Sequence, residues 1–360
     1  MEVGECTGTQ FLPQQETGNG RADLTIIVGM DRSNNQSSLE RGALPPLIVI
    51  AGPTGAGKTR LGVALAKRLN GEVVSADSRY LYRGFDIGVA KPTVAERGGI
   101  PHHLIDVVPA DGEMSLATYH ELAMRAIAEI HGRGRLPLLV GGTPLYLKAI
   151  VEGWHIPRVP PNPVFRAQLE AEAAVTGGEA IVARLRIVDP VSADQANGNL
   201  RRVIRALEIF DATGIPKSAL EQSGPRPFAT LEIELTMPRE QLYGVIDRRV
   251  DQQIEMGLVA EVRALVEGGL TADAPSMTSI GYRQLLPYLA GERTLEAAIA
   301  QIKYDTHRYV RHQQTWLRRN DRLVRIEVTE PGLIDRVEAL VVRFLSLGEE
   351  APSEDPDQPR

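Results

Sequence analysis

The feature that most constrains this chain is a glycine-rich segment, Gly52-Pro53-Thr54-Gly55-Ala56-Gly57-Lys58-Thr59. It follows an apolar run at 47–51 and precedes an amphipathic segment at 60–69, so a strand, a tight turn and a helix are expected in succession. This is the setting of a phosphate-binding P-loop, whose pattern is G-x-x-x-x-G-K-[ST]. Its backbone N–H groups and helix N-terminus bind phosphate oxygens. The segment therefore predicts a site for a diphosphate or triphosphate, with Lys58 as its cation and Thr59 as a ligand for Mg²⁺.

The composition is that of an ordinary globular protein and limits the classes of partner. The 360 residues, 43% of them hydrophobic, suffice for one large domain and a smaller one. The single cysteine, Cys6, excludes an intrachain disulfide and a multi-cysteine zinc site. No apolar run approaches the ~18 residues that span a bilayer, and the first residues lack the positive charge of a signal peptide. We therefore expect a cytoplasmic protein without membrane contact. Its net charge of −6 confines any RNA site to a local basic patch.

Short apolar segments alternate with helical patterns along the chain. Strands are expected at 47–51, 72–76, 103–108, 136–140, 231–237 and 323–328, and helices at 115–131, 239–267, 279–290 and 295–318. Fully apolar strands separated by helices are typical of parallel sheets that are covered on both faces. The expected fold class is therefore α/β, with a P-loop-type parallel sheet core flanked by helices. A proline-rich connector at 154–163 is followed by helical patterns alone, which predicts an inserted all-helical domain.

These patterns divide the chain into six parts. Residues 1–44 are polar and irregular and are expected to form a disordered leader. The P-loop core would comprise residues 45–151 and 229–330, and the helical insertion domain would lie between them at 152–228. A C-terminal helix is expected at 331–348. The acidic, proline-rich residues 349–360 would form a disordered tail.

Three of the expected strands end in residues that can perform chemistry. Ligands of open α/β sheets bind at the carboxyl ends of the strands, and these ends carry the P-loop, Asp77 and the segment Gly141-Gly142-Thr143. Asp77 could hold Mg²⁺ through water, act as a general base or cap a turn. Thr143 could contact a ligand or only shape its turn. Strand 136–140 lacks the terminal acid of a Walker B element, which disfavours a nucleotide hydrolase, although Asp106 could substitute.

Two basic helical segments are candidates for contact with RNA. Arg201, Arg202 and Arg205 fall on one side of a helix, and the segment 304–319 interleaves arginines with aromatic side chains. Arginine beside an aromatic ring suits the stacking of an unpaired base. A solvent-exposed helix face that binds nothing has similar runs of charge, so this interpretation competes with RNA binding. Arg283 could likewise clamp a phosphate or simply be exposed.

Together with the P-loop, a series of further segments resembles the tRNA dimethylallyltransferase (tRNA isopentenyltransferase) family. In family order they are SADSR at 75–79, YRGFDIG at 82–88, AKP at 90–92, PHHLID at 101–106, VGGT at 140–143 with LY at 145–146, RRVIRALE at 201–208, GYRQ at 281–284 and QTWLR at 314–318. The resemblance covers roughly residues 46–328. It departs from the family pattern at Tyr80, where many relatives carry glutamine, and at Pro144, where glycine is common. Residues 1–44 have no counterpart, and the zinc finger of some eukaryotic relatives is absent.

The resemblance implies a reaction and roles for single residues. A dimethylallyl group would pass from dimethylallyl diphosphate to the N6 amine of the adenosine just 3′ of a tRNA anticodon, with release of diphosphate. The P-loop would hold the donor diphosphate, Thr59 would bind Mg²⁺, and Lys58 and Arg283 would stabilise the leaving group. Asp77 matches the general base, and Thr143 matches a contact to the target nucleotide, which would be flipped out of its stack.

The resemblance also implies the partners and the residues that contact them. The partners would be the anticodon stem-loop of tRNA and dimethylallyl diphosphate, bound by a monomer. The residues that align with tRNA-contacting positions of the family are Asp77, Ser78, Arg79, Tyr80, Thr143, Arg166, Arg201, Arg202, Val203, Ile204, Arg205, Thr278, Ser279, Ile280, Gly281, Tyr282 and Arg283.

Three other functions compete with this hypothesis. A prenyltransferase that acts on free adenine nucleotides would share the core motifs but would not need the basic insertion. A P-loop small-molecule kinase would turn over ATP, and the missing Walker B acid disfavours it. A non-catalytic RNA-binding protein that uses a nucleotide as a switch would keep its function when Asp77 is replaced.

Overall fold

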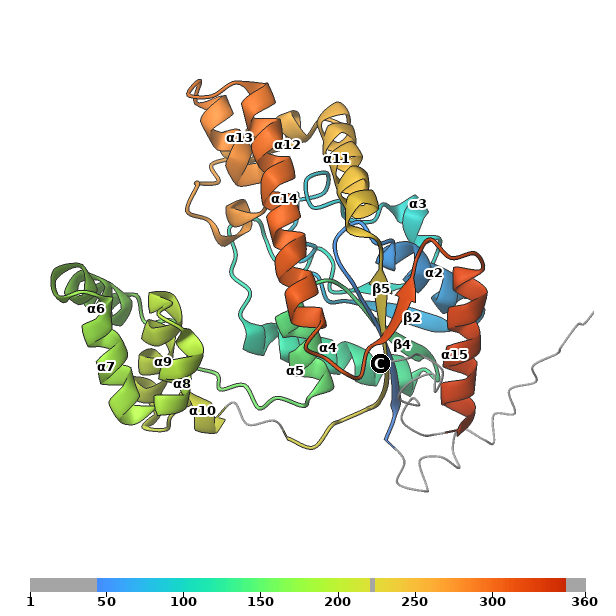
Figure 1. Ribbon diagram of the computed structural model, residues 1–360, viewed down its shortest axis with the longest axis horizontal. Coiled ribbons are helices and arrows are strands. Elements are labelled where there is room, and N and C mark those ends of the chain that lie inside the picture. The colour runs from blue at the N-terminus through green and yellow to red at the C-terminus, as the bar shows by residue number, and fades with distance from the viewer. Residues whose placement is uncertain (1–43, 221–223, 348–360) are drawn as a thin grey trace, which may run out of the picture. The chain divides into compact units, whose positions relative to one another are not determined.

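The computed structural model describes residues 44–220 and 224–347. Apart from residue 44, the leader expected at 1–44 lies outside the described residues, as does the tail expected at 349–360. The described chain is built around one sheet (Figure 1), in which six parallel strands follow the order β3-β2-β4-β1-β5-β6. The strands are β1 (Pro46–Ala51), β2 (Gly71–Ser75), β3 (His102–His103), β4 (Leu136–Val140), β5 (Ala229–Thr236) and β6 (Val324–Glu327). This arrangement confirms the α/β fold class.

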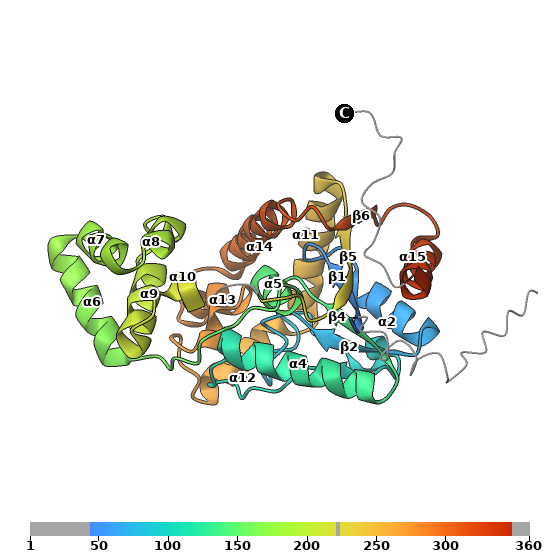
Figure 2. The same ribbon diagram turned by 90° about the horizontal axis from the view of Figure 1, so that it is seen from below.

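Both faces of the sheet are covered by helices, as the apolar strands require. Alternate residues of β1 point to opposite faces, so that Leu47 and Val49 join one apolar cluster and Ile48 and Ile50 the other. Helices α4 (Leu116–Gly132) and α5 (Pro144–Val151) cover the first face, and α2 (Lys58–Arg68) and α15 (Leu333–Leu347) cover the second (Figure 2). The first cluster also takes in residues of α11 (Arg239–Glu255), α12 (Leu258–Glu267), α13 (Tyr282–Leu289) and α14 (Leu295–Leu317).

Three sequence-based boundaries are wrong, each for a local backbone reason. The third strand is limited to His102–His103, because Leu104 and Asp106 adopt left-handed φ angles of 62° and 58° that a strand cannot contain. The helix expected at 239–267 is two helices, since Gly257 breaks it with a φ of 102°. The helix expected at 279–290 begins only at Tyr282, after a 3₁₀ turn at Pro275–Thr278.

A group of helices between α5 and β5 has an apolar core of its own. It consists of α6 (Pro163–Thr176), α7 (Gly178–Val188), α8 (Pro190–Ala196), α9 (Leu200–Thr213) and α10 (Lys217–Leu220), drawn in green in Figure 1. Leu169, Ile181, Leu185 and Val203 are buried together there, separately from both clusters of the sheet. Asn162, Asp189 and Asn199 cap the starts of α6, α8 and α9 with their side chains.

No helix of the described chain is long and apolar enough to cross a membrane. A short helix, α3 (Val94–Arg97), lies in the long connection from β2 to β3. This connection, residues 76–101, leaves the carboxyl end of β2, contacts the P-loop helix α2 through α3, and carries several of the predicted site residues.

Candidate active site at the carboxyl ends of the strands

The P-loop has the backbone that its sequence predicts. It connects the end of β1 at Ala51 to the start of α2 at Lys58. Gly52, Gly55 and Gly57 take positive φ angles of 145°, 89° and 82°, which other L-residues rarely adopt. A Cβ atom on Gly52 would lie 2.7 Å from the carbonyl oxygen of Leu235 in β5. The loop therefore needs glycine both for its conformation and for its close approach to the neighbouring strand.

Lys58 lies inside this loop. Its ammonium donates a hydrogen bond of 2.9 Å to the carbonyl of Pro53, across the mouth of the loop. Burial lowers the pKa of Lys58 to about 8; the negative charge of Asp77 opposes this shift, and the positive charge of Arg249 adds to it. An anionic phosphate bound beside Lys58 would raise this pKa again, because it would stabilise the charged form.

Tyr80 and Arg249 complete the polar wall beside the P-loop. The Tyr80 hydroxyl donates a hydrogen bond of 3.0 Å to the carbonyl of Ala90. Burial raises the pKa of Tyr80 to about 12, and the side chains of Thr59 and Arg249 lie near its hydroxyl. Arg249 comes from α11, so this helix brings a second cation to the phosphate side of the crevice.

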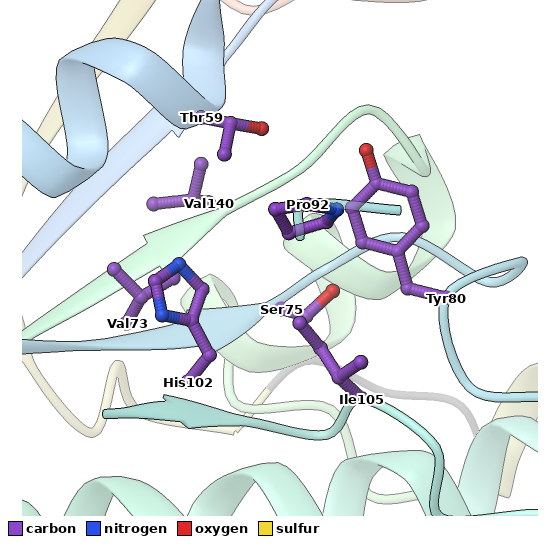
Figure 3. A pocket seen from close by; sticks show the side chains of 8 residues that line it. All are labelled: Thr59, Val73, Ser75, Tyr80, Pro92, His102, Ile105 and Val140. Atoms are coloured by element: carbon purple, nitrogen blue, oxygen red, sulfur yellow. The ribbon is translucent and has the colours of Figure 1, made fainter. Parts of the chain in front are cut away.

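A small, partly open cavity lies beside Thr59 and Tyr80. Thr59, Tyr80, Ser75 and His102 are among its lining residues (Figure 3). Its volume of about 20 Å³ is close to that of one water molecule. The cavity is too small for a five-carbon chain or a base.

Asp77 and Thr143 face each other across the ends of β2 and β4. The backbone N–H of Ser78 donates to the Thr143 hydroxyl at 3.0 Å, and the N–H of Thr143 donates to the carbonyl of Ala76 at 3.1 Å. One carboxylate oxygen of Asp77 accepts the N–H of Arg79 at 2.9 Å. Asp77 is half-buried, and its negative charge reaches Lys58. The ends of β1, β2 and β4 therefore bring the P-loop, Asp77 and Thr143 close together, as expected.

Helix α14 closes the crevice from a distant part of the chain. The Gln313 side chain, only 2% exposed, accepts the N–H of Thr54 at 3.0 Å and donates to the carbonyl of Gly142 at 2.6 Å. One turn earlier, the Tyr309 side chain lies near those of Thr143 and Gln313. Although 37% of Tyr309 is exposed, the protein around its hydroxyl and the nearby charge of Asp77 raise its pKa well above the usual range. Thus α14 touches both the P-loop and the segment that carries Thr143.

Arg283 and Asp106 each have a charged partner outside the P-loop. Arg283 has its acidic partner on α14, where its guanidinium is 3.6 Å from the Asp305 carboxylate. Eight residues separate Asp305 from Gln313, which corresponds to about 12 Å along the helix. Asp106 pairs at 2.6 Å with Lys91, which also binds Asp86. Asp106 therefore stabilises the connection after β2 through Lys91, and it does not take the place of a Walker B acid.

The predicted tRNA-contacting arginines of the insertion differ in exposure and in pairing. Arg166 binds both oxygens of Glu208 at 2.9 and 2.8 Å, and Arg205 binds the same carboxylate and the carbonyl of Val159. Val203 and Ile204 are buried in the apolar core of the insertion, 0% and 3% exposed. Their side chains are therefore not accessible to RNA. Arg201 and Arg202, at the exposed start of α9, are the accessible residues of this run.

The GYR segment near the start of α13 holds the connection after β2. The Tyr282 hydroxyl donates to Glu261, whose carboxylate also accepts the N–H groups of Ile87 and Gly88. A Cβ atom on Gly88 would lie 2.4 Å from the Tyr282 ring. In the same region the Arg79 guanidinium donates to the carbonyl of Pro275. Ser279, Gly281 and Tyr282 are buried, Ile280 is half-buried, and Thr278 and Arg283 are exposed.

The basic stripe expected on the last long helix is exposed. Arg308, Arg311, Thr315 and Arg319 are all exposed, the first three on α14 and Arg319 just beyond its end. The guanidinium of Arg311 donates to the Tyr243 hydroxyl on α11 at 3.2 Å. The ring of Tyr243 stacks on that of His307, with 4.0 Å between the ring centroids. This face presents the arginine and aromatic groups that an unpaired base could meet.

Sequence reasoning missed Gln313 and Arg249. The sequence contains a signal for Gln313, because it continues the buried stripe of Ile302, Val310 and Leu317 on α14. A glutamine in an apolar stripe must find internal hydrogen bonds. Arg249 gives no such signal, since it is half-buried and one of many arginines.

The donor set for a metal ion is small. Among residues 44–220 and 224–347, no group of three or more His, Cys, Asp and Glu side chains could hold a metal ion. Mg²⁺ in phosphate sites is usually held by one or two protein oxygens, several waters and the phosphates themselves. The Thr59 hydroxyl at the start of α2 and the nearby Asp77 carboxylate suit that mode of binding.

Comparisons with known proteins agree on one family. A family model described as IPP transferase matches residues 80–320. The tRNA dimethylallyltransferase of Thermomicrobium roseum is 54% identical over 301 residues, which cover 83% of this chain and 92% of that protein. The tRNA isopentenylpyrophosphate transferase of Bacillus halodurans is 40% identical in its crystal structure, with a TM-score of 0.65 over 84% of this chain and 97% of that one. A eukaryotic dimethylallyltransferase acting on tRNA is 29% identical, with a TM-score of 0.73 over 88% and 82% of the two chains.

Proposed function

This chain belongs to the IPP transferase family and is a tRNA dimethylallyltransferase, and we propose how its strand-end crevice carries out the transfer. The P-loop, residues 52–59, binds the diphosphate of dimethylallyl diphosphate. The crevice between Asp77 and Thr143 receives the adenosine beside the tRNA anticodon. The observation that carries this proposal is the convergence of Lys58, Arg249, Asp77 and Thr143 on one crevice, with two cations on one side and a carboxylate and a hydroxyl on the other.

The bond changes follow from this division of charge. The N6 amine of the adenine attacks the terminal allylic carbon, the carbon–oxygen bond breaks, and diphosphate leaves with its electron pair. Negative charge grows on the leaving oxygen, where Lys58, Arg249 and the loop N–H groups stabilise it. The proton lost from the amine passes to Asp77, whose second carboxylate oxygen is not used by the Arg79 N–H.

The Thr59 hydroxyl at the start of α2 would hold Mg²⁺ beside the donor's diphosphate. When bound, it supplies positive charge that neutralises the departing diphosphate. Arg283 has a different place in this scheme from the one expected from the sequence. Since it pairs with Asp305, we assign it to contact with tRNA, and we assign the second diphosphate cation to Arg249.

Contact with the anticodon arm draws on exposed groups. Arg201 and Arg202 of α9, the stripe of Arg308 and Arg311 on α14, and Thr278 before α13 are accessible to a polyanion. Arg166 and Arg205 act indirectly, because they fix the connector to α9 through Glu208. We propose that the protein acts as a monomer on cytoplasmic tRNA.

The experiment that tests the proposal is nucleoside mass spectrometry of unmodified tRNA after incubation with the protein, Mg²⁺ and dimethylallyl diphosphate. The proposal requires a mass increase of one C₅H₈ unit on the adenosine beside the anticodon. Parallel reactions with AMP and with ATP plus small acceptors test the competing functions. Prenylation of AMP alone, or rapid turnover of ATP with unaltered tRNA, would overturn the proposal.

The role of Asp77 is tested by the variant Asp77→Asn. The amide keeps the size of the side chain and can still accept the Arg79 N–H, but it cannot take a proton. We expect transfer to fall by ~10²–10⁴-fold while the affinity for tRNA is kept. The matched control is Asp111→Asn, because Asp111 is exposed. Equal transfer rates in Asp77→Asn and the control would remove Asp77 from the mechanism.

A further inference from the structure

A continuous chain of hydrogen-bonded amides connects the two halves of the crevice. It starts at the Lys58 ammonium, which donates to the carbonyl of Pro53 at 2.9 Å. The Thr54 N–H belongs to the same peptide group as the Pro53 carbonyl. It donates to the Gln313 side-chain oxygen at 3.0 Å. The Gln313 amide then donates to the carbonyl of Gly142 at 2.6 Å. Each amide group in this chain accepts a hydrogen bond at its carbonyl and donates one from its N–H. The hydrogen bonds therefore all run in the same direction along the chain.

The chain continues to the carboxylate side of the crevice. The peptide group that begins with the Gly142 carbonyl ends with the Thr143 N–H, which donates to the carbonyl of Ala76 at 3.1 Å. That peptide group ends with the N–H of Asp77, which donates to the Ser75 hydroxyl at 3.3 Å. Three peptide groups and one side-chain amide thus link the lysine of the diphosphate site to the backbone of Asp77 and Thr143.

Gln313 is the link that holds the two halves together. The other internal links are peptide groups from β1–α2, from β4–α5 and from the end of β2, whereas Gln313 comes from α14, 259 residues after Thr54 of the P-loop. Its orientation is fixed by its partners, since a backbone N–H needs an acceptor and a carbonyl needs a donor. The packing leaves no slack, because a Cβ atom on Gly142 would lie 2.5 Å from the Gln313 amide nitrogen and 3.4 Å from the Lys58 ammonium.

We propose that Gln313 is a positioning residue that couples diphosphate binding to the placement of the target adenosine. It acts through the Pro53–Thr54 peptide group on one side and through the Gly142–Thr143 peptide group on the other. A diphosphate that takes the Lys58 ammonium away from the Pro53 carbonyl removes the cation from the head of the chain. Because hydrogen bonds in a chain polarise one another, the bonds that hold Thr143 and the Asp77 backbone then change in strength. This inference rests on the proposed roles of Lys58, Thr143 and Asp77.

The coupling can be measured without turnover. Inorganic diphosphate with Mg²⁺ replaces the donor, and an unmodified anticodon stem-loop replaces the acceptor. Calorimetry gives the affinity for each ligand alone and in the presence of the other, and the two ratios must agree. For the unaltered protein we expect one ligand to change the affinity for the other by about 5-fold or more, the low end of ordinary coupling.

Two variants of Gln313 test the link. Gln313→Met keeps the length of the side chain but neither accepts nor donates, and Gln313→Glu keeps an acceptor for Thr54 while it loses the amide donor to Gly142. We expect each to bind both ligands singly, with the mutual effect reduced to less than about 2-fold. Gln301→Met, elsewhere on α14 and outside the crevice, is the matched control and should keep the coupling. If Gln313→Met does not fold, as judged by its unfolding transition, Gln313→Glu decides.

The possible outcomes separate this inference from the proposed function. If neither ligand binds the unaltered protein, the proposed function fails and the coupling fails with it. If both ligands bind the unaltered protein without affecting each other, only the coupling is refuted. The coupling through Gln313 is also refuted if the Gln313 variants keep the full effect of one ligand on the affinity for the other. The same holds if the variants bind each ligand more weakly while this mutual effect stays as large as in the unaltered protein.

Discussion

Gly141, beside Asp77 and Thr143, is a position where the structure leaves no room for a side chain. It follows β4 directly, and a Cβ atom there would lie 2.2 Å from the carbonyl oxygen of Ala76 and 2.3 Å from the carbonyl carbon. Ordinary contacts of this kind are about 3.4 Å or longer. The variant Gly141→Ala therefore requires the ends of β2 and β4 to separate by about 1 Å. The obstructed oxygen is the acceptor of the Thr143 N–H, so the separation displaces Thr143 from Asp77.

The expected cost has a structural and a catalytic part. Forcing an extra carbon into a packed site costs about 1–3 kcal/mol of unfolding free energy, or roughly 2–4 °C in Tm for each kcal/mol. A displacement of about 1 Å in a catalytic constellation costs about 10²-fold in rate. Gly141→Ala should therefore lower kcat by about 10²-fold and Tm by several degrees, measured by single-turnover transfer to tRNA and by thermal unfolding.

Gly132→Ala is the matched control for this substitution. Gly132 is the last residue of α4, it is exposed, and a Cβ atom there would meet nothing within 4 Å. The same change should there be neutral or stabilising by up to about 1 kcal/mol. If Gly141→Ala transfers as fast as Gly132→Ala and unfolds at the same temperature, the close approach of the two strand ends is not needed, and the geometric reasoning is refuted.

Three further predictions concern charged groups. Since the pKa of Lys58 is lowered to about 8, kcat/KM for dimethylallyl diphosphate should be level below this pH and fall by up to ~10-fold per unit above it; a level profile up to pH 10 would contradict that role. Arg249→Gln should raise the KM for the donor by ~10–100-fold and move this break to higher pH, because removing a neighbouring cation raises the pKa of Lys58; an unmoved break would show that Arg249 does not face Lys58. Glu208→Gln should lower the unfolding free energy by about 1–3 kcal/mol and raise the KM for tRNA. The two arginines and the Asn162 N–H hold the pKa of Glu208 at about 2, against an unfolded value near 4.5, so its stabilisation is complete above about pH 4.5 and is lost as the pH falls towards 2. Thermal unfolding between pH 5 and 2 should therefore be less pH-dependent in Glu208→Gln than in the unaltered protein.

Local features were predictable from the sequence. The P-loop could be located because its glycines, its lysine and the flanking periodicities are all properties of a single short segment. The convergence of Asp77 and Thr143 could be predicted as well, because parallel strands place their carboxyl ends at one edge of the sheet. The sequence also indicated the helical insertion, since its helices share an apolar periodicity without strands.

The errors came from residues whose conformation depends on what they pack against. His102 and His103 pair with β2, but Leu104 and Asp106 leave the strand because Lys91 and the Tyr80 carbonyl bind Asp106 from another segment. The partners of Arg166 and Arg205 were equally hidden. A run of arginines has the same sequence whether it contacts solvent, RNA or a buried glutamate. Here Arg166 and Arg205 both pair with Glu208, whose side chain is 1% exposed.

The sequence by itself determined the phosphate-binding turn, the parallel α/β architecture and the family, because these follow from short-range backbone preferences and from motifs in a fixed order. Only the tertiary structure decided that Arg249 of α11 faces Lys58 and that Gln313 of α14 joins the P-loop to Gly142. The physical reason is that these contacts join segments about 170 to 260 residues apart. Which polar group fills such a position depends on how the helices pack on the sheet, and no local pattern of residues encodes that choice.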